Sequence, residues 1–249
     1  MNEDMDAIAR MRAITFSREY GSGGGEIAVR LARRLGWQLV DHEVVVEVAN
    51  ALGVSEAEAE ARDERVEGLA SRILSSLQLV EPIMLVGSPT LHETYEQKYR
   101  DALFNVVEAA VTQGHVVIVG RGSQILLAQR RDVFHARIIA PLQLRVAYVM
   151  QREGLNQNDA SSRVQLKDRD RIRYLQAEHH QSPEDAHLYD LVVNTGIIDL
   201  DSAVDLIVLA LERKARKLST PTGALGPAAG LPRYPGHPGD FRPPESVTE

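Results

Sequence analysis

The stretch Ser17-Arg18-Glu19-Tyr20-Gly21-Ser22-Gly23-Gly24-Gly25-Glu26 decides the fold of this chain. It follows a short apolar run, residues 13–16, and it leads into residues 27–35, whose apolar spacing is helical. A strand, a glycine loop and a helix in this order direct backbone N–H groups and a helix N-terminus at an anion. Glycine at four of five consecutive positions costs too much conformational entropy for an ordinary flexible turn. The stretch therefore predicts a phosphate-binding loop.

The same glycines allow a second nucleotide-binding interpretation. Residues 23–28 fit the dinucleotide fingerprint G-x-G-x-x-A, and Asp41 lies about where a ribose-binding acid is expected. The first glycine of that fingerprint follows its strand closely, whereas residues 17–22 separate Phe16 from Gly23 here. A loop of this length suits a phosphate chain, so we favour a phosphate loop over a dinucleotide-dependent oxidoreductase.

The loop lacks the lysine of the pattern G-x-x-x-x-G-K-[ST]. With Gly21 and Gly23 at the usual glycine positions, Gly24 stands where the lysine belongs, and Glu26 falls near the metal-binding hydroxyl. A cation about 4 Å from a phosphate contributes on the order of 4 kcal/mol at an effective dielectric of 20, or roughly a thousandfold in rate. Arg18 is the nearest cation that can supply this charge.

Composition narrows the class of protein. The chain has 249 residues, 44% hydrophobic and 25% charged, with a formal net charge of −7 and no cysteine. These values predict one sizeable α/β domain without disulfides, thiolate zinc sites or thiol catalysis. The acidic balance gives no general basic surface for nucleic acid or an anionic membrane. No apolar run approaches the ~18 residues that span a bilayer, and residues 1–12 lack a signal-peptide plan, so we expect a cytoplasmic protein.

Apolar periodicity predicts strands alternating with helices, and hence a parallel sheet flanked by helices. We expect strands at 13–16, 37–40, 115–119, 134–140 and 188–193, with helices at 24–35, 42–52, 92–113, 124–129, 141–150, 156–178 and 201–213. The expected organisation is a flexible N-terminus at 1–11, a domain at 12–216, and a disordered Pro/Gly-rich tail at 217–249. Residues 55–113 form a helical insertion with no strand of its own.

Charged residues at three places are candidates for a site. Arg121 and Asp41 each follow a predicted strand, at the carboxyl edge where open α/β sheets bind ligands. Arg121 is alternatively a surface residue at a helix start, and Asp41 alternatively caps a helix. Arg169 and Arg173 lie four apart and share one helix face, from which Arg171 is offset. The alternative for that segment is a salt-bridged helix surface.

Several stretches together resemble the cytidylate kinase-like family, a divergent branch of P-loop nucleoside monophosphate kinases. The loop carries most of the resemblance, from residue 14 to residue 28. Three others follow in order: residues 41–43 after the second strand, residues 117–122 ending in Gly120-Arg121-Gly122, and residues 189–195 around the last strand. Residues 167–173 are similar to the arginine-rich lid of true cytidylate kinases. The resemblance covers roughly residues 12–214.

The resemblance implies a three-layer P-loop NTPase-type fold, with a substrate-binding insertion at 55–113 and a mobile lid at 156–180. It also implies ATP, Mg²⁺ and nucleotide substrates. The expected phosphate-binding residues are Gly21, Ser22, Gly23, Gly24, Gly25 and Glu26. Charge stabilisation is expected from Arg18, Arg169 and Arg173, and substrate binding from Asp41, Arg121 and Asp170.

The chain departs from true cytidylate kinases at three positions. They have lysine where Gly24 stands, an acidic residue at Gly122, and a small hydroxyl residue at His42. We therefore expect ATP-dependent phosphoryl transfer to a nucleoside monophosphate, with two alternatives. One is a nucleotide-binding sensor or interaction protein that has lost catalysis, and the other is a kinase of a non-nucleotide acceptor.

Overall fold

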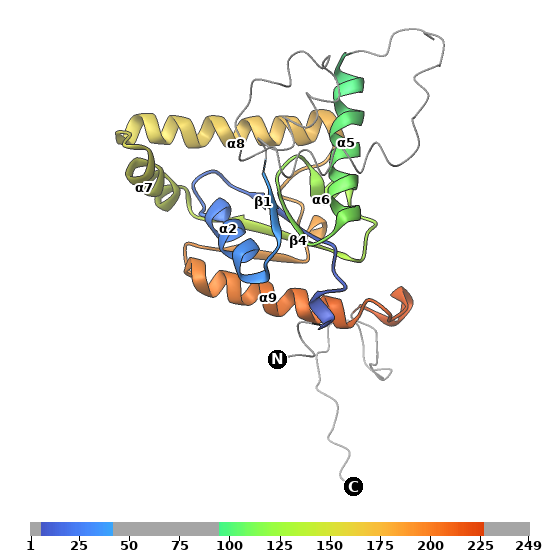
Figure 1. The fold of residues 1–249 in the computed structure, drawn as a ribbon. Helices are drawn as coiled ribbons and strands as arrows, with labels where there is room; N and C mark the ends of the chain where they lie inside the picture. The colour runs from blue at the N-terminus through green and yellow to red at the C-terminus, as the bar shows by residue number, and fades with distance from the viewer. Residues whose placement is uncertain (1–5, 42–94, 227–249) are drawn as a thin grey trace, which may run out of the picture.

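The structure is a computed structural model that describes residues 6–41 and 95–226 (Figure 1). Its sheet has five parallel strands in the order β2-β3-β1-β4-β5. The strands are β1 (Ala13–Arg18), β2 (Gln38–Val40), β3 (Val116–Val119), β4 (Val133–Ile139) and β5 (Leu191–Asn194). The predicted P-loop-type α/β fold is confirmed, with β1 at the centre of the sheet.

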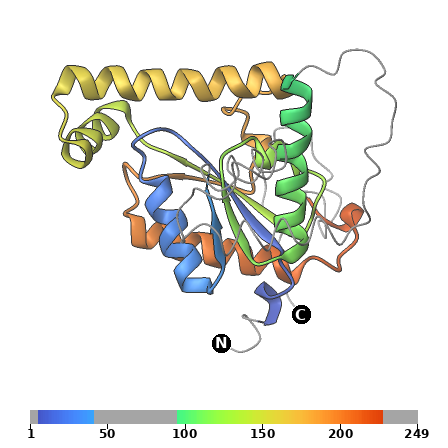
Figure 2. The same ribbon diagram turned by 45° about the horizontal axis from the view of Figure 1, so that its top comes forward.

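Helices cover both faces of this sheet, and one long helix crosses its carboxyl edge. They are α2 (Gly24–Leu35), α5 (Tyr95–Gln113), α6 (Ser123–Leu126), α7 (Leu142–Glu153), α8 (Gln157–His179) and α9 (Leu200–Arg216). Helices α2 and α9 lie on one face and α5 lies on the other, while α8 runs across the top in the turned view (Figure 2). The described part of the chain contains no helix that is long and apolar enough to cross a membrane.

The core explains why the strands read as continuous apolar runs. Alternate residues of β1 point to opposite faces: Ile14 and Phe16 pack under α2 and α9, and Ala13 packs in the cluster beside α5. A strand with both faces covered has no solvent side, so its polar positions disappear. The last two residues of β1, Ser17 and Arg18, point to these two opposite faces, so their side chains have different neighbours.

The predicted elements are found with shifted ends. Strand β1 extends to Arg18, two residues past the expected end, because it pairs with β4 as far as Ile138. Strand β5 begins at Leu191, since residues 186–188 form a 3-10 turn capped by Asp185. Asn156 caps α8, where a helix start was expected. A short 3-10 turn, Thr222–Ala224, lies in the part of the tail that is described. The predictions for residues 42–94 and 227–249 lie outside the described residues.

Candidate functional site

The glycine loop between β1 and α2 has the backbone of an anion site. Gly21 and Gly23 adopt left-handed φ angles of 81° and 76°. A Cβ at Gly21 would lie 2.8 Å from the Arg145 carbonyl, and one at Gly23 would lie 2.7 Å from Leu200 Cδ2, so neither position accommodates a side chain. Gly23 is the N-cap of α2 and no side chain caps the helix there. The first N–H groups of α2 are thus available to an anion.

Arg18 occupies the space in front of Gly24. A Cβ at residue 24 would lie 2.9 Å from the Arg18 Cβ and 3.4 Å from its Cδ. The same side chain extends toward Gly120 after β3, where a Cβ would lie 3.2 Å from an Arg18 terminal nitrogen. The lysine position of a standard phosphate loop is therefore filled by an arginine that comes from the end of β1.

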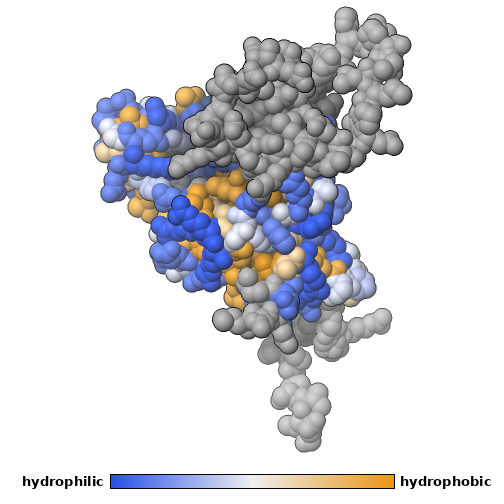
Figure 3. Space-filling model, viewed as in Figure 1, coloured by the Kyte–Doolittle hydropathy of each residue, from blue (hydrophilic) through white to orange (hydrophobic). Residues whose placement is uncertain are grey.

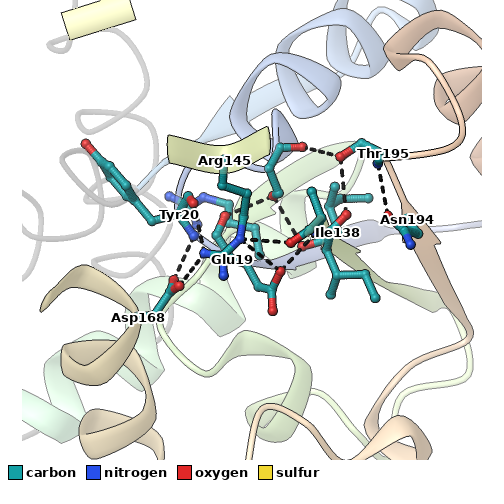
Figure 4. A network of polar contacts seen from close by, with 12 residues as sticks. Glu19, Tyr20, Ile138, Arg145, Asp168, Asn194 and Thr195 are labelled. Carbon is teal, nitrogen blue, oxygen red and sulfur yellow. Dashed lines mark hydrogen bonds and ion pairs between the residues drawn. The ribbon is translucent and has the colours of Figure 1, made fainter. Parts of the chain in front are cut away.

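Side chains of Glu19 and Arg145 connect the loop to the neighbouring elements (Figure 4). Arg145 donates to the carbonyls of Ala140 (2.9 Å) and Tyr20 (3.1 Å) and pairs with Asp168. Glu19 accepts the N–H of Ala140 at 2.9 Å. Asp168 of α8 also accepts the N–H of Tyr20 at 2.7 Å. One buried guanidinium thus joins the loop, the end of β4 and α8.

Thr195, after β5, holds the other end of the loop. Its hydroxyl donates to the carbonyls of Ser22 (2.8 Å) and Ile139 (3.2 Å). The Ser22 hydroxyl in turn donates to the Glu19 carbonyl at 2.9 Å. Because Ser22 is buried and its hydroxyl is engaged, this serine shapes the loop and does not present its side chain to a ligand. The expected contribution of Ser22 is therefore limited to its backbone.

A cavity of about 720 Å³ opens between the loop, the end of β3 and α8. Its cations come from five separate elements or loops, and they are Arg18, Arg121, Arg137, Arg145, Lys167 and Arg171. Four acidic residues share the wall: Glu19, Asp168, Asp170 and Glu184. Tyr20, Tyr174 and Leu175 add aromatic and apolar surface. A cavity with these walls suits an anionic ligand that also has an apolar part.

A second cavity of about 410 Å³ lies on the α2 side of β1. It is lined by the start of α2 at Gly25 and Glu26, and by Asp41 after β2. Arg18 borders both cavities. Hydrophilic surface covers the region of α2 in Figure 3, and the α2 arginines Arg30, Arg33 and Arg34 are exposed. Two of them, Arg30 and Arg33, line this cavity.

The residues expected from the sequence are divided between these surroundings. Gly25, Glu26 and Asp41 line the smaller cavity, and Arg121 and Asp170 line the larger one. Arg169 and Arg173 are exposed and line neither cavity. On this helix the cavity-lining arginine is Arg171, which donates to the Arg18 carbonyl at 3.2 Å. The geometry thus brings Arg171 to the cavity and leaves Arg169 and Arg173, the two arginines expected from the sequence, outside it.

The apolar stripe of α8 contains the signal that identifies Arg171. Ala160, Val164 and Leu175 are buried and share one side of the helix. Asp168 and Arg171 fall on that same side by helical periodicity, whereas Arg169 and Arg173 fall on the opposite side. The buried side therefore carries both residues that contact the glycine loop.

Burial, with a smaller contribution from neighbouring cations, lowers the pKa of two arginines of the site. Burial and the charge of Arg171 together lower the pKa of Arg18 to about 10, while Asp41 opposes the shift. Burial likewise lowers the pKa of Arg171, with Arg145 and Arg137 adding to the effect against Asp168. Arg18 and Arg171 both remain protonated near pH 7. Cations crowded in this way are stabilised by a bound anion.

Few side chains near the loop offer metal ligands. No group of three or more His, Asp or Glu side chains with metal-site geometry occurs within residues 6–41 and 95–226. One oxygen of Glu26 already accepts the Tyr148 hydroxyl at 2.6 Å. At Gly122, where true cytidylate kinases carry an acid, φ is 65° and a Cβ would lie 2.6 Å from His179 Nε2, so a side chain there would strain the backbone and displace the His179 ring.

The comparisons with known proteins agree with this architecture. The model of the cytidylate kinase-like family matches residues 13–197. The chain belongs to the cytidylate kinase-like family. The match runs from the first residue of β1 to just beyond β5, so it includes the glycine loop, both cavity walls and α8.

Two curated relatives align with part of the chain. The cytidylate kinase of Methanopyrus kandleri is 26% identical over 113 residues, which is 41% of this chain and 58% of the relative. A uronate isomerase of Corynebacterium glutamicum is 36% identical over 105 residues, 42% of this chain and 20% of the relative. The chain thus spans less than two thirds of either relative.

A solved structure supports the fold alone. A protein of Eubacterium ventriosum, described as uncharacterized, superposes with a TM-score of 0.60 at 22% identity. The superposition covers 81% of this chain and 98% of the other. Its near-complete coverage shows that this arrangement of sheet and helices occurs as a unit in another chain.

Proposed function

We propose that this protein transfers a phosphoryl group from ATP to a nucleoside monophosphate. The observation that carries the proposal is the position of Arg18. Its side chain takes the space of the missing lysine and borders both cavities, at the boundary where a transferred group would pass from donor to acceptor. Phosphoryl transfer depends mainly on positioning and on positive charge around the moving group.

The residues divide the task as follows. Backbone N–H groups of residues 21–25 and the N-terminus of α2 bind the phosphates of the donor. Arg18 and Arg171 stabilise the charge that develops on the transferring group, and Arg121 contacts the acceptor in the larger cavity. Asp168 ties α8 to the loop, so this helix is placed to exclude water and limit hydrolysis of ATP.

Mg²⁺ is the metal that this chemistry requires. Glu26 and Asp41 line the smaller cavity and provide carboxylate oxygens, the donors that Mg²⁺ accepts alongside substrate phosphates. When bound, the ion would neutralise charge on the donor phosphates. The glycine loop of the protein would orient the donor phosphates, and its arginines would add positive charge to that of the ion.

A coupled assay with the purified protein, ATP, Mg²⁺ and a panel of nucleoside monophosphates tests the proposal directly. We expect formation of one nucleoside diphosphate well above the rate of ATP hydrolysis without acceptor. A panel of sugar and polyol acceptors is run in parallel. Turnover of one of those, with no monophosphate phosphorylated, would replace the nucleotide acceptor by another class.

A second candidate is a nucleotide-binding protein without catalysis. It is favoured by Gly122, which stands where true cytidylate kinases carry an acid and where a Cβ would lie 2.6 Å from His179 Nε2. Such a protein would bind ATP, measured by isothermal titration calorimetry, but form no product from any acceptor in the panel. That pair of results would favour this candidate over the kinase.

A further inference from the structure

Arg137 is a buried cation that the sequence did not single out. It lies on β4, is 7% exposed and lines the larger cavity. One terminal nitrogen donates to Ser17 Oγ at 3.0 Å, and the guanidinium lies 5.6 Å from the centre of the Tyr189 ring. Among the residues that the structure describes, no carboxylate forms an ion pair with it. Burying such a charge is costly unless a partner compensates it.

Arg145 shows what a compensated arginine looks like in the same wall. It is 8% exposed, close to the value for Arg137. Two carbonyls accept its N–H groups, and two carboxylates, Glu19 and Asp168, lie within ion-pair distance. Arg137 has the same five donors and directs one to a neutral hydroxyl. Arg145 therefore holds the structure together, whereas residues 6–41 and 95–226 leave other N–H groups of Arg137 for a ligand.

The orientation of Arg137 is fixed by its neighbours. Ser17 Oγ also hydrogen-bonds to the Tyr189 hydroxyl at 3.1 Å, and that hydroxyl hydrogen-bonds to the Pro183 carbonyl at 2.9 Å. The guanidinium is thus held between a hydroxyl and an aromatic ring without losing its charge. A cation fixed in this way binds an anion with little further loss of side-chain entropy.

Arg137 lies on the side of the sheet away from the glycine loop. Ser17 and Arg18 are consecutive on β1, so their side chains point to opposite faces. Arg18 is on the α2 side, in contact with the loop, and Arg137 is on the side of Ser17. The two guanidiniums therefore start from opposite faces of the sheet: Arg18 borders both cavities, and Arg137 lines the larger cavity alone.

We propose that Arg137 binds a phosphate group that the acceptor already carries, and so selects a phosphorylated acceptor over a neutral one. This inference rests on the proposed function and names a residue that determines its substrate class. The larger cavity accommodates such a molecule, with Arg137 at its anionic end and Tyr20, Tyr174 and Leu175 along the remaining wall. A phosphate on the acceptor accepts hydrogen bonds from Arg137 and also compensates its charge, whereas a neutral polyol offers hydroxyl acceptors without the negative charge.

Calorimetric binding of matched pairs tests this assignment. Each of the four ribonucleoside monophosphates, its nucleoside, and ATP is titrated into wild type and Arg137→Met. We expect at least one monophosphate to lose roughly 10- to 100-fold in affinity, the effect of a lost charge-assisted hydrogen bond, while its nucleoside and ATP change by less than about threefold. Equal losses for monophosphate and nucleoside, or no loss, would overturn the assignment, as would a wild type that binds no monophosphate.

Two further variants keep the test independent of folding and of turnover. Arg131→Met removes a half-buried arginine just before β4, which donates to the Lys217 carbonyl and lines neither cavity, and it should change neither affinity. Tyr189→Phe keeps the charge of Arg137 but loosens its support, and we expect a smaller loss, about three- to tenfold, for monophosphate alone. This variant decides the question if Arg137→Met fails to fold. Because only binding is measured, absence of transfer would refute the proposed function without refuting the role of Arg137.

Discussion

The side chain of Arg18 lies against Gly24, so that a Cβ on residue 24 would come within 2.9 Å of the Arg18 Cβ. Position 24, where a standard phosphate loop has its lysine, carries a glycine, and Arg18 is proposed to supply the positive charge instead. The helix start is bare, and the cation comes from the strand that precedes the loop. The arginine and the glycine therefore depend on each other, and each has consequences that can be measured.

Removing the charge of Arg18 should impair function strongly. Losing a cation about 4 Å from a phosphate costs on the order of 4 kcal/mol, so we expect Arg18→Ala to reduce ATP-dependent turnover by roughly a thousandfold. Arg34→Ala is the matched control, because Arg34 is an exposed α2 arginine paired with Asp205 and lines neither cavity. Arg33, which borders the smaller cavity, is unsuitable. Equal, small effects of both variants would show that Arg18 does not replace the lysine.

Restoring the missing lysine alone should fail. In Gly24→Lys the new Cβ meets Arg18 and also lies 3.3 Å from Ile138 Cβ, so we expect a lower melting temperature and weaker ATP binding. Adding Arg18→Gly removes the main obstruction, and the double variant should recover both properties. Gly25→Ala is the control, since a Cβ there meets nothing within 4 Å. Additive effects of the two substitutions would contradict the exchange of roles.

Asp168 should contribute more to stability than its neighbour Asp170. Asp168→Asn leaves the buried Arg145 without its closest carboxylate and weakens the bond to the Tyr20 N–H. We expect the free energy of unfolding to fall by about 2–3 kcal/mol, the range for hydrogen bonds to charged groups. Asp170→Asn, on an exposed position of the same helix, should fall within about 0.5 kcal/mol of wild type. Urea unfolding of both variants measures the difference.

His135 should make stability depend on pH. It is buried on β4 beside Thr15, with a ring nitrogen 2.7 Å from the Thr15 hydroxyl. Burial, together with the charge of Lys214, lowers the pKa of His135 to about 4, while Asp190 opposes the shift. As the pH falls, the unfolded chain therefore binds a proton at His135 before the folded protein does. The contribution of His135 to the free energy of unfolding is complete above about pH 6.5 and is lost as the pH falls toward 4.

Between about pH 6.5 and pH 4, we expect the free energy of unfolding to fall by an amount on the order of 2–3 kcal/mol because of His135. Urea unfolding of wild type and His135→Gln between pH 4 and pH 7 isolates it from the titration of carboxylates, which both proteins share. His180→Gln removes a histidine that is exposed at the end of α8, away from His135, and serves as the control. A difference between wild type and His135→Gln that does not vary with pH would refute the assignment.

Local sequence determined the central architecture of this protein. The glycines of the loop, the apolar runs before and after it, and the alternation of strands with helices predict a P-loop-type sheet because each depends on neighbouring residues alone. Arg18 was identifiable in the same way, since it lies a few residues from the position of the missing lysine. The ends of elements were less certain, because pairing with a distant strand extended β1 to Arg18.

Tertiary structure decided which charges face the site. The run of residues 167–173 has arginines on two opposite sides of its helix, and the packing of Ala160, Val164 and Leu175 turns Arg171 inward and Arg169 and Arg173 outward. Arg137 became visible as a ligand-binding candidate only when β4 paired beside β1 and placed it against Ser17. The rotation of a helix and the partner of a strand are set by contacts between residues far apart in the chain.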